Sequence, residues 1–116
     1  MAGMKTVQAG ELNQRIQILR RVVSHDEAGY ESVVQEELIL GCWARVSRTS
    51  GTELVRANAD FGEEKVRFLI RHPHREIDRK MFVRWQGREY EIEYINDYAG
   101  RRYLEIWTVR RSKEAG

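Results

Sequence analysis

The chain alternates between apolar and polar residues over several short segments, which is the spacing of half-buried β-strands. In the segment 15–23, Ile16 and Ile18 share one face while Leu19 falls on the other. This change of phase predicts either a β-bulge or a strand whose two faces are both partly covered. Residues 31–40 are ambiguous, because a polar stretch separates two apolar runs.

The later segments alternate more regularly. Tyr90, Ile92 and Tyr94 alternate with three glutamates, so this strand is expected to bury one face and expose the other. Gln86-Gly87 predicts a two-residue hairpin turn, because glycine tolerates a positive φ. The further strands predicted are 42–48, 64–72, 81–85, 88–94 and 103–109, with another turn over 96–100.

The period changes to a helical one after residue 48. Ser50 precedes Glu53 by three residues, which is the spacing of a capping box. Gly62 stands where a glycine often ends a helix. These signals predict one helix over residues 51–61, whose apolar stripe is formed by Leu54, Ala57 and Phe61.

Short strands at hairpin spacing with one inserted helix predict a mainly β fold. We expect a small antiparallel β-barrel or sandwich of about six strands with one short α-helix. The 116 residues suffice for one domain with its own core. Residues 1–9 are expected to form a flexible arm, residues 10–112 the domain and residues 113–116 a short tail.

Composition narrows the classes of function. The chain is 41% hydrophobic and 33% charged, yet its formal net charge is only +2, which disfavours a dedicated nucleic-acid coat. The single Cys42 excludes an internal disulfide and fits a reducing compartment. No apolar run has the length of a transmembrane helix, and residues 1–10 do not have the pattern of a secretory signal, so we expect no membrane partner.

Candidate catalytic and metal-binding residues are few. Cys42 lies in an apolar strand face and is best explained as a small buried hydrophobe. His72 and His74 are close neighbours, but His25 is distant and no cysteine completes a zinc pattern. We therefore expect no catalytic residue, no metal, no cofactor and no enzymatic activity.

The charged residues offer a contact surface instead. The row Glu89, Glu91 and Glu93 is most simply a solvated face, and its alternative is a contact with a basic partner. Arg67 and Arg71 make the strand 64–72 basic. Opposed charge faces of this kind would suit the contact between neighbouring subunits of a ring. The arginines near the predicted helix are an alternative nucleic-acid contact, namely Arg45, Arg48 and Arg56.

Four short segments occur, once each, in a characteristic order along the chain. They are Gly10-Glu11-Leu12-Asn13, Trp43-Ala44-Arg45-Val46, Trp85-Gln86-Gly87-Arg88-Glu89-Tyr90 and Arg101-Arg102-Tyr103-Leu104-Glu105-Ile106. In this order and spacing the chain resembles the phage head–tail joining family, the small head-completion or stopper proteins of tailed siphophages. The resemblance covers about residues 10–109.

The resemblance implies a structural protein of the virion neck that is assembled in the host cytoplasm. Such proteins form a ring, typically dodecameric, at the portal and adaptor. The ring completes the DNA-filled head, lets DNA pass through its channel, and docks a tail terminator or tail tube. The resemblance brings no catalytic residue and no cofactor.

Within this reading, the predicted helix and its flanks are the expected assembly or channel segment. Its residues are Arg48, Ser50, Glu53, Leu54, Arg56, Ala57 and Phe61. The alternative for this segment is an ordinary helix that plugs one end of the barrel. For the whole chain, the alternatives are a small nucleic-acid-binding β-barrel module and a ring protein of the tail-terminator type.

Overall fold

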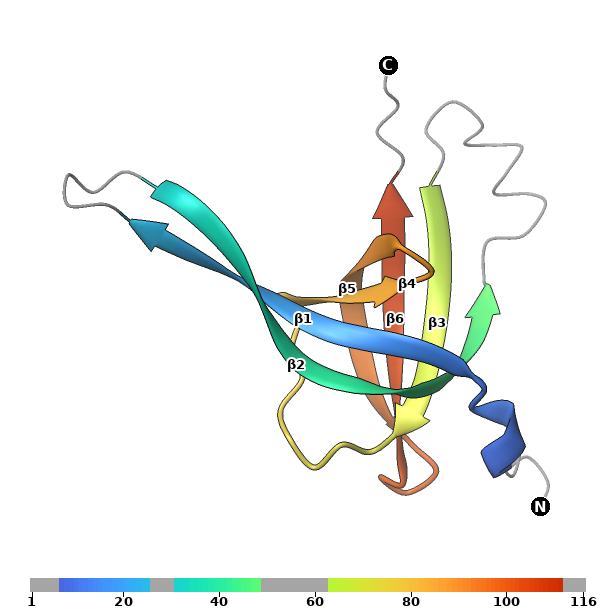
Figure 1. Cartoon of the computed structure of the whole chain (residues 1–116). Coiled ribbons are helices and arrows are strands. Elements are labelled where there is room, and N and C mark those ends of the chain that lie inside the picture. Colours follow the sequence, from blue (N-terminus) through green and yellow to red (C-terminus); the bar gives the residue numbers. More distant parts are fainter. Residues whose placement is uncertain (1–6, 26–30, 49–62, 112–116) are drawn as a thin grey trace.

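Six antiparallel strands close into one barrel in the computed structural model, which describes residues 7–25, 31–48 and 63–111. The strands follow the order β1-β2-β3-β6-β5-β4 around the barrel (Figure 1). The elements are the 3-10 turn η1 (Ala9–Glu11) and the strands β1 (Gln14–His25), β2 (Glu31–Arg48), β3 (Glu63–Arg71), β4 (Met81–Trp85), β5 (Arg88–Tyr98) and β6 (Tyr103–Arg111).

The prediction of a mainly β, antiparallel barrel of about six strands is confirmed. The predicted helix over 51–61 lies outside the described residues. In the part of the chain that is described, no helix is long and apolar enough to cross a membrane.

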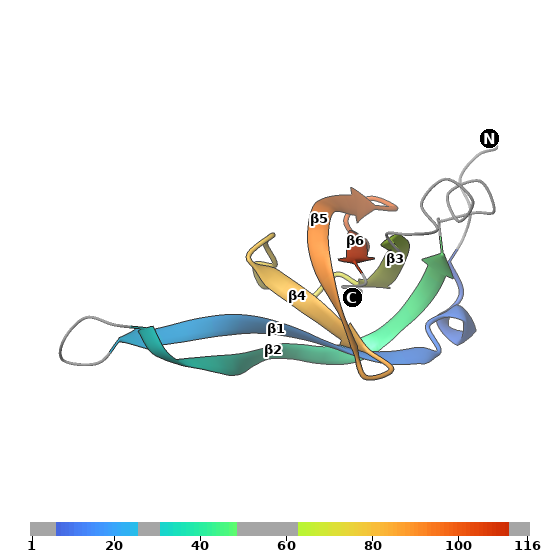
Figure 2. The same cartoon turned by 90° about the horizontal axis from the view of Figure 1, so that it is seen from above.

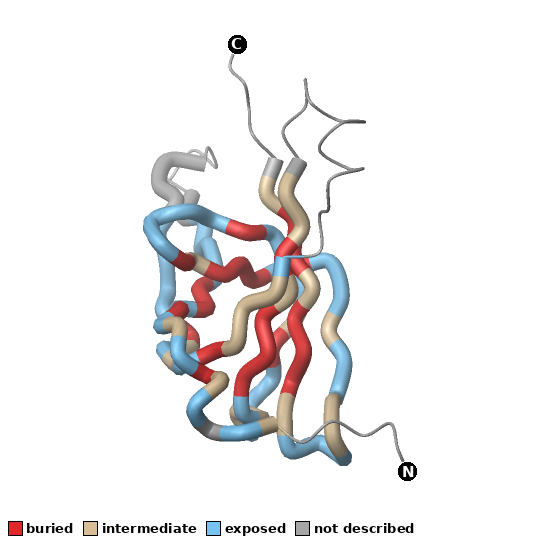
Figure 3. Tube along the Cα trace, turned by 90° about the vertical axis from the view of Figure 1, so that its right-hand side faces the viewer, coloured by how far each residue is buried: buried red, intermediate tan, exposed pale blue. Residues whose placement is uncertain are grey.

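The core is built from the inward faces of all six strands, and Figure 3 shows these buried residues along the barrel. Phe68 lies at its centre, with its ring edge-on to Trp85 and to Tyr90 at centroid distances of 5.7 Å. Edge-to-face packing of this kind is favourable, because the positive edge of one ring meets the negative face of the other. These aromatic residues from β3, β4 and β5 therefore join strands across the interior of the barrel.

The phase change in the first strand coincides with a β-bulge, which is one of the two structures that the sequence predicted for it. Ile18 pairs with Leu40 and Leu19 pairs with Leu38, so the pairing skips Ile39. The extra residue thus belongs to β2, and Arg75 donates a hydrogen bond to its carbonyl at 2.7 Å. Because the extra residue is in β2, β1 itself keeps alternating: Ile18 lies in the core, and Leu19 is buried on the opposite face of the strand.

The barrel closes along a short seam between β1 and β4, where Gln17–Arg20 pair with Met81–Arg84. Beyond Arg20, β1 and β2 continue without β4 as a two-stranded ribbon that projects from the barrel (Figures 1 and 2). We call residues 21–25 and 31–37 the ribbon. The ambiguous segment 31–40 is therefore the first part of one long strand, continuous with the predicted strand 42–48.

β5 departs from its predicted pattern after Ile92. The pairing with β6 skips Glu93, so a bulge reverses the alternation. Tyr94 consequently points outward and is 56% exposed, whereas Ile95 packs against the core. The predicted burial of Tyr94 was wrong, because the inserted residue reverses which face of β5 each later side chain occupies.

The turns differ in how well they were predicted. Gln86 and Gly87 have φ values of 54° and 74°, so the two-residue hairpin between β4 and β5 is confirmed. The turn expected over 96–100 was wrong in position, because β5 runs on to Tyr98 and the turn occupies 99–102.

Candidate functional site

The predicted assembly or channel segment is described at one residue only. Arg48 ends β2, where its guanidinium lies 5.8 Å from the centre of the Trp85 ring and 3.9 Å from the Glu64 carboxylate. Arg48 thus lies where β2 leaves the barrel. The other residues of the segment lie outside the described residues, namely Ser50, Glu53, Leu54, Arg56, Ala57 and Phe61.

The predicted acidic row on β5 is occupied by ion pairs within the chain. Glu89 accepts hydrogen bonds from Arg21 at 2.8 Å and from Arg84 at 2.6 Å. Glu91 lies 3.4 Å from Arg21. The third member of the row, Glu93, lies 3.6 Å from Lys65. A basic partner would therefore have to share or replace these contacts.

The two predicted basic residues on β3 differ in their surroundings. Arg67 lies 4.7 Å from the centre of the Trp107 ring and 3.6 Å from the carboxylate of Glu105. Glu105 is 8% exposed and also accepts a hydrogen bond from the Trp107 indole at 3.0 Å. Arg67 is thus held within its own sheet. Arg71, in contrast, has no carboxylate within ion-pair distance among the described residues.

A charged network at the base of the ribbon was missed by sequence reasoning. Arg84 donates to Glu36 at 2.7 Å as well as to Glu89, and these bonds hold the Arg84 pKa above its ordinary value. The bond from Arg84 likewise holds the pKa of the Glu36 carboxyl below its ordinary value. The sequence signal for this network was the polar stretch 35–37, which interrupts the apolar pattern. Its glutamates bind arginines of other strands, since Arg20 also binds Glu37 at 2.7 Å.

A basic pocket, also missed, lies on the outer face of the barrel where β3 ends. Arg15, Trp43 and Arg71 line it, and we call it the Arg15–Trp43–Arg71 pocket. Arg15 and Trp43 are register partners, and the guanidinium lies 5.5 Å from the centre of the indole ring. The volume is about 430 Å³, and the remaining lining residues are Leu12, Gly41 and Cys42. Only the pairing register, which the sequence does not give, brings these side chains together.

Cys42 also lines this pocket, and its half-buried side chain packs against the core of the barrel. Burial raises the pKa of the Cys42 thiol to about 11, and the nearby charge of Arg15 opposes the shift. The thiol is therefore neutral at physiological pH, which makes it a poor nucleophile.

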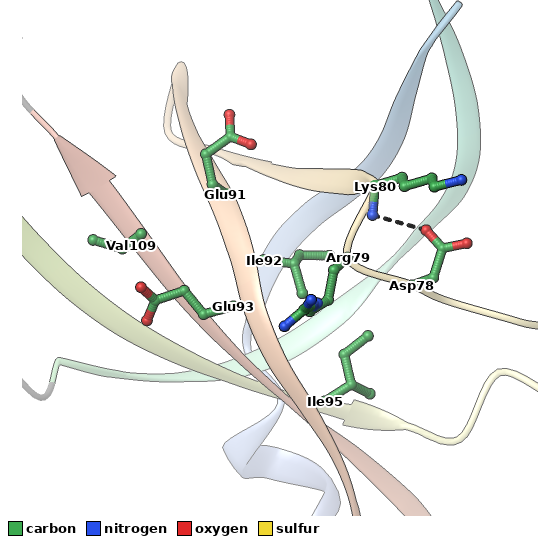
Figure 4. A pocket seen from close by; sticks show the side chains of 8 residues that line it. All are labelled: Asp78, Arg79, Lys80, Glu91, Ile92, Glu93, Ile95 and Val109. Carbon is green, nitrogen blue, oxygen red and sulfur yellow. Dashed lines mark hydrogen bonds between the residues drawn. The ribbon is translucent and has the colours of Figure 1, made fainter.

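A second, wider groove lies between β5 and the segment that leads into β4 (Figure 4). It has a volume of about 820 Å³. Arg79 and Lys80 lie on one side and Glu91 and Glu93 on the other, while Asp78 accepts a hydrogen bond from the backbone of Lys80 at 2.9 Å. Charges of both signs line the groove, so it favours no single class of charged ligand.

The histidines form no metal centre in the described residues, where no group of three His, Cys, Asp or Glu side chains could hold an ion. The Nδ1 atom of His72 accepts a hydrogen bond from the backbone of His74 at 3.2 Å. The Nε2 atom of His72 lies 3.6 Å from Asp97. The two ring nitrogens thus face the loop after β3 and the end of β5.

The chain is similar to a known protein family and to solved structures. A family model described as phage head completion protein matches residues 7–111. The solution structure of SF1141 from Shigella flexneri 2a is similar, with a TM-score of 0.67 and 25% identity over 93% of this chain and 99% of that chain. A chain of the native gene transfer agent virion has a TM-score of 0.63 and 22% identity over 89% of this chain and 97% of that chain. No curated protein matches the chain.

Proposed function

Because the chain belongs to the phage head completion protein family, we propose that it forms a ring at the portal and adaptor vertex. There it closes the DNA-filled head and provides the surface on which the tail docks. The observation that carries the proposal is the extent of the family match, which covers all six strands of the barrel. A structural role in completing a phage head follows from the family itself.

A ring of identical subunits needs two different surfaces that complement each other. Exposed apolar residues occur on several separate parts of the described chain, and two of these parts could form such complementary surfaces. Val22 and Leu38 lie on and beside the ribbon, and Tyr94 lies on the outer face of β5. Isolated two-stranded hairpins are marginally stable in water, so a neighbouring subunit would stabilise the ribbon.

The predicted charged contact between subunits remains part of the proposal. Arg71 is available to a neighbouring carboxylate without breaking a contact to any described residue. The other members would exchange partners within the chain for partners across the interface, namely Arg67, Glu89, Glu91 and Glu93. A charge swap on one face should block assembly, and the complementary swap on the other should restore it.

The segment from Arg48 to Phe61 is proposed to face the adaptor, the channel or the adjacent subunit. Its placement between β2 and β3 supports this, because Arg48 marks the end of the barrel where β2 leaves. Replacing residues 51–61 by a short glycine–serine linker should leave the barrel folded and stop assembly. Normal assembly of that variant would assign the segment to barrel closure alone.

The test of the main proposal is deletion of the gene from its phage or prophage, followed by electron microscopy of the lysate. Unjoined heads that have leaked their DNA, beside separate tails, are the expected result, and the wild-type gene supplied in trans should restore virions. Filled heads with overlong or malformed tails would instead assign the chain to the tail-terminator class. Normal infectious virions would overturn the structural role.

The nucleic-acid-binding alternative is tested on the isolated chain. A free DNA-binding module would bind duplex DNA as a monomer, and its affinity would fall steeply with salt because phosphate contacts release counterions. We expect no such binding, since the net charge is only +2.

A further inference from the structure

The Arg15–Trp43–Arg71 pocket carries two positive charges that the described residues leave unneutralised. No described carboxylate lies within ion-pair distance of Arg15 or of Arg71. Trp43 lies between them with 53% of its surface exposed. A solvent-exposed indole flanked by two guanidinium groups is an arrangement suited to an anionic group next to an apolar one.

The neighbouring arginines on the same outer face are neutralised within the chain. Arg45 donates to Glu11 at 2.8 Å, and Arg67 lies 3.6 Å from Glu105. Arg45 and Arg67 therefore add no unpaired positive charge beside the pocket. Binding along a nucleic-acid backbone draws on several cations in a row, so these charges fit a single carboxylate better than a run of phosphates.

The shape of the pocket also favours a protein segment. Its lining is partly apolar, because Leu12 and the half-buried Cys42 contribute to it together with the exposed Trp43. The pairing of β2 with β3 begins at Ala44, so the edge of β2 at Gly41–Trp43 is not covered by β3. An open strand edge can pair with an added extended chain, which then places alternate side chains on the same face.

Gly41 gives the guanidinium of Arg15 its room. A Cβ atom at Gly41 would lie 3.4 Å from the Arg15 Nη2 atom, so the guanidinium lies across the backbone of β2 at this residue. The Arg15 side chain is thereby directed toward the centre of the pocket. Arg71 approaches the pocket from β3 on the other side of Trp43.

We propose that the Arg15–Trp43–Arg71 pocket binds an extended segment of a protein partner that carries a carboxylate beside an apolar side chain. The carboxylate accepts charge-assisted hydrogen bonds from Arg15 and Arg71, and the apolar side chain packs on the indole of Trp43. The inference rests on the proposed function in that the partner is another structural protein of the virion.

The indole N–H of Trp43 provides a direct readout. Trp85 donates its indole N–H to Gln14 and Trp107 to Glu105, whereas the Trp43 indole has no acceptor among the described residues. Three indole signals are therefore expected in a proton–nitrogen NMR spectrum, since the chain has three tryptophans. The signal of Trp43 is assigned from its loss in Trp43→Phe.

The experiment titrates the isolated chain with three acetylated, amidated peptides. One alternates glutamate with leucine, the second replaces glutamate by glutamine, and the third replaces leucine by alanine. We expect the glutamate–leucine peptide to shift the Trp43 signal selectively. The glutamine peptide and the alanine peptide should both bind more weakly. Arg71→Gln should weaken binding about tenfold, because one charge-assisted hydrogen bond is lost. Arg79→Gln, a matched change at an exposed arginine outside the pocket, should leave it unchanged.

Three outcomes would overturn the inference. The first is no shift of the Trp43 signal with peptide up to about 10 mM, which is weaker than a useful docking contact. The second is an equal shift with the glutamine peptide. The third is a selective shift of Trp43 by oligothymidylate or duplex DNA at lower concentration, which would make the pocket a nucleic-acid site. Each outcome concerns the pocket alone, whereas the phenotype of the gene deletion decides the role in head completion.

Discussion

Arg84 donates a hydrogen bond to Glu36 at 2.7 Å, although these residues lie on β4 and β2, two strands that do not pair with each other. The bond crosses β1, which separates the two strands. Glu89 accepts a second bond from the same guanidinium and a further one from Arg21. This network joins the base of the ribbon to the barrel.

The first prediction concerns the titration of Glu36. Its pKa is held below the ordinary value by the bond from Arg84, so the network is present above pH 4.5 and is lost as the pH falls through the lower pKa of the folded chain. Arg84→Gln should raise the pKa of Glu36 toward 4.5, as followed by carbon NMR of the carboxyl group. Arg79→Gln should leave it unchanged, and an equal rise in both variants would contradict the role of Arg84.

The second prediction compares two leucines that are register partners. Leu19 is 5% exposed and Leu38 is 56% exposed. Leu19→Ala should lower the free energy of unfolding by about 2–4 kcal/mol, because it leaves a cavity. Leu38→Ala should change it by less than about 0.5 kcal/mol. Urea denaturation measures both, and similar losses would mean that Leu38 is covered in the isolated chain.

Leu38 also tests the role of the ribbon in assembly. In a phage lacking the gene, the Leu38→Asp chain supplied in trans should give fewer joined virions than the wild-type chain, because a charge at a subunit contact must be desolvated. Gln17→Asp is the matched control, since Gln17 is exposed and polar. Full complementation by Leu38→Asp would remove the surface beside the ribbon at Leu38 from the subunit contact.

The third prediction concerns two buried hydroxyl groups. Among the described residues, the buried hydroxyl of Tyr90 has no hydrogen-bond partner, whereas that of Thr108 donates to the carbonyl of Val66 at 2.9 Å. Tyr90→Phe should therefore keep or raise the free energy of unfolding, by up to about 1 kcal/mol. Thr108→Val, which keeps the shape of the side chain, should lower it by about 1 kcal/mol. The reverse order in thermal and urea denaturation would place an acceptor at Tyr90.

The fourth prediction concerns the thiol of Cys42. Its pKa of about 11 lies above the ordinary value of 9.0, so the folded chain keeps the proton that the unfolded chain loses between these values. Its contribution to stability is complete below pH 9.0 and declines as the pH rises toward 11. At pH 8 the folded chain should react with iodoacetamide about a hundredfold more slowly than in urea. Mass spectrometry measures the rates, and equal rates would contradict the raised pKa.

Much of the barrel could be predicted because its strands bury one face. β4 was placed to the residue, and the inward positions Val66, Phe68 and Ile70 of β3 followed from simple alternation. The same alternation failed at Glu93, where one inserted residue reverses the faces of β5. Periodicity records which residues are apolar but not how many residues the neighbouring strand uses to match them.

The ribbon and the basic pocket escaped prediction for different reasons. The ribbon side chains at 21–23 and 35–37 are exposed, so the strands need no alternation there. Glu36 and Glu37 therefore interrupt the apolar pattern without breaking the strand. The pocket depends on the register that sets Arg15 beside Trp43 and on the place where β3 ends at Arg71. Neither fact is local to any one segment of the sequence.

The seam between β1 and β4 has a consequence for the order of folding. The seam pairs Arg20 with Met81, so it closes a long loop of chain that contains β2 and β3. The hairpins β1–β2 and β4–β5 connect neighbours in sequence and can form early, whereas a contact between distant residues carries a larger loss of chain entropy. We expect the seam to form late in folding. Until then Ile16 and Ile18 remain exposed, and this is the interval in which a nascent chain is most open to aggregation.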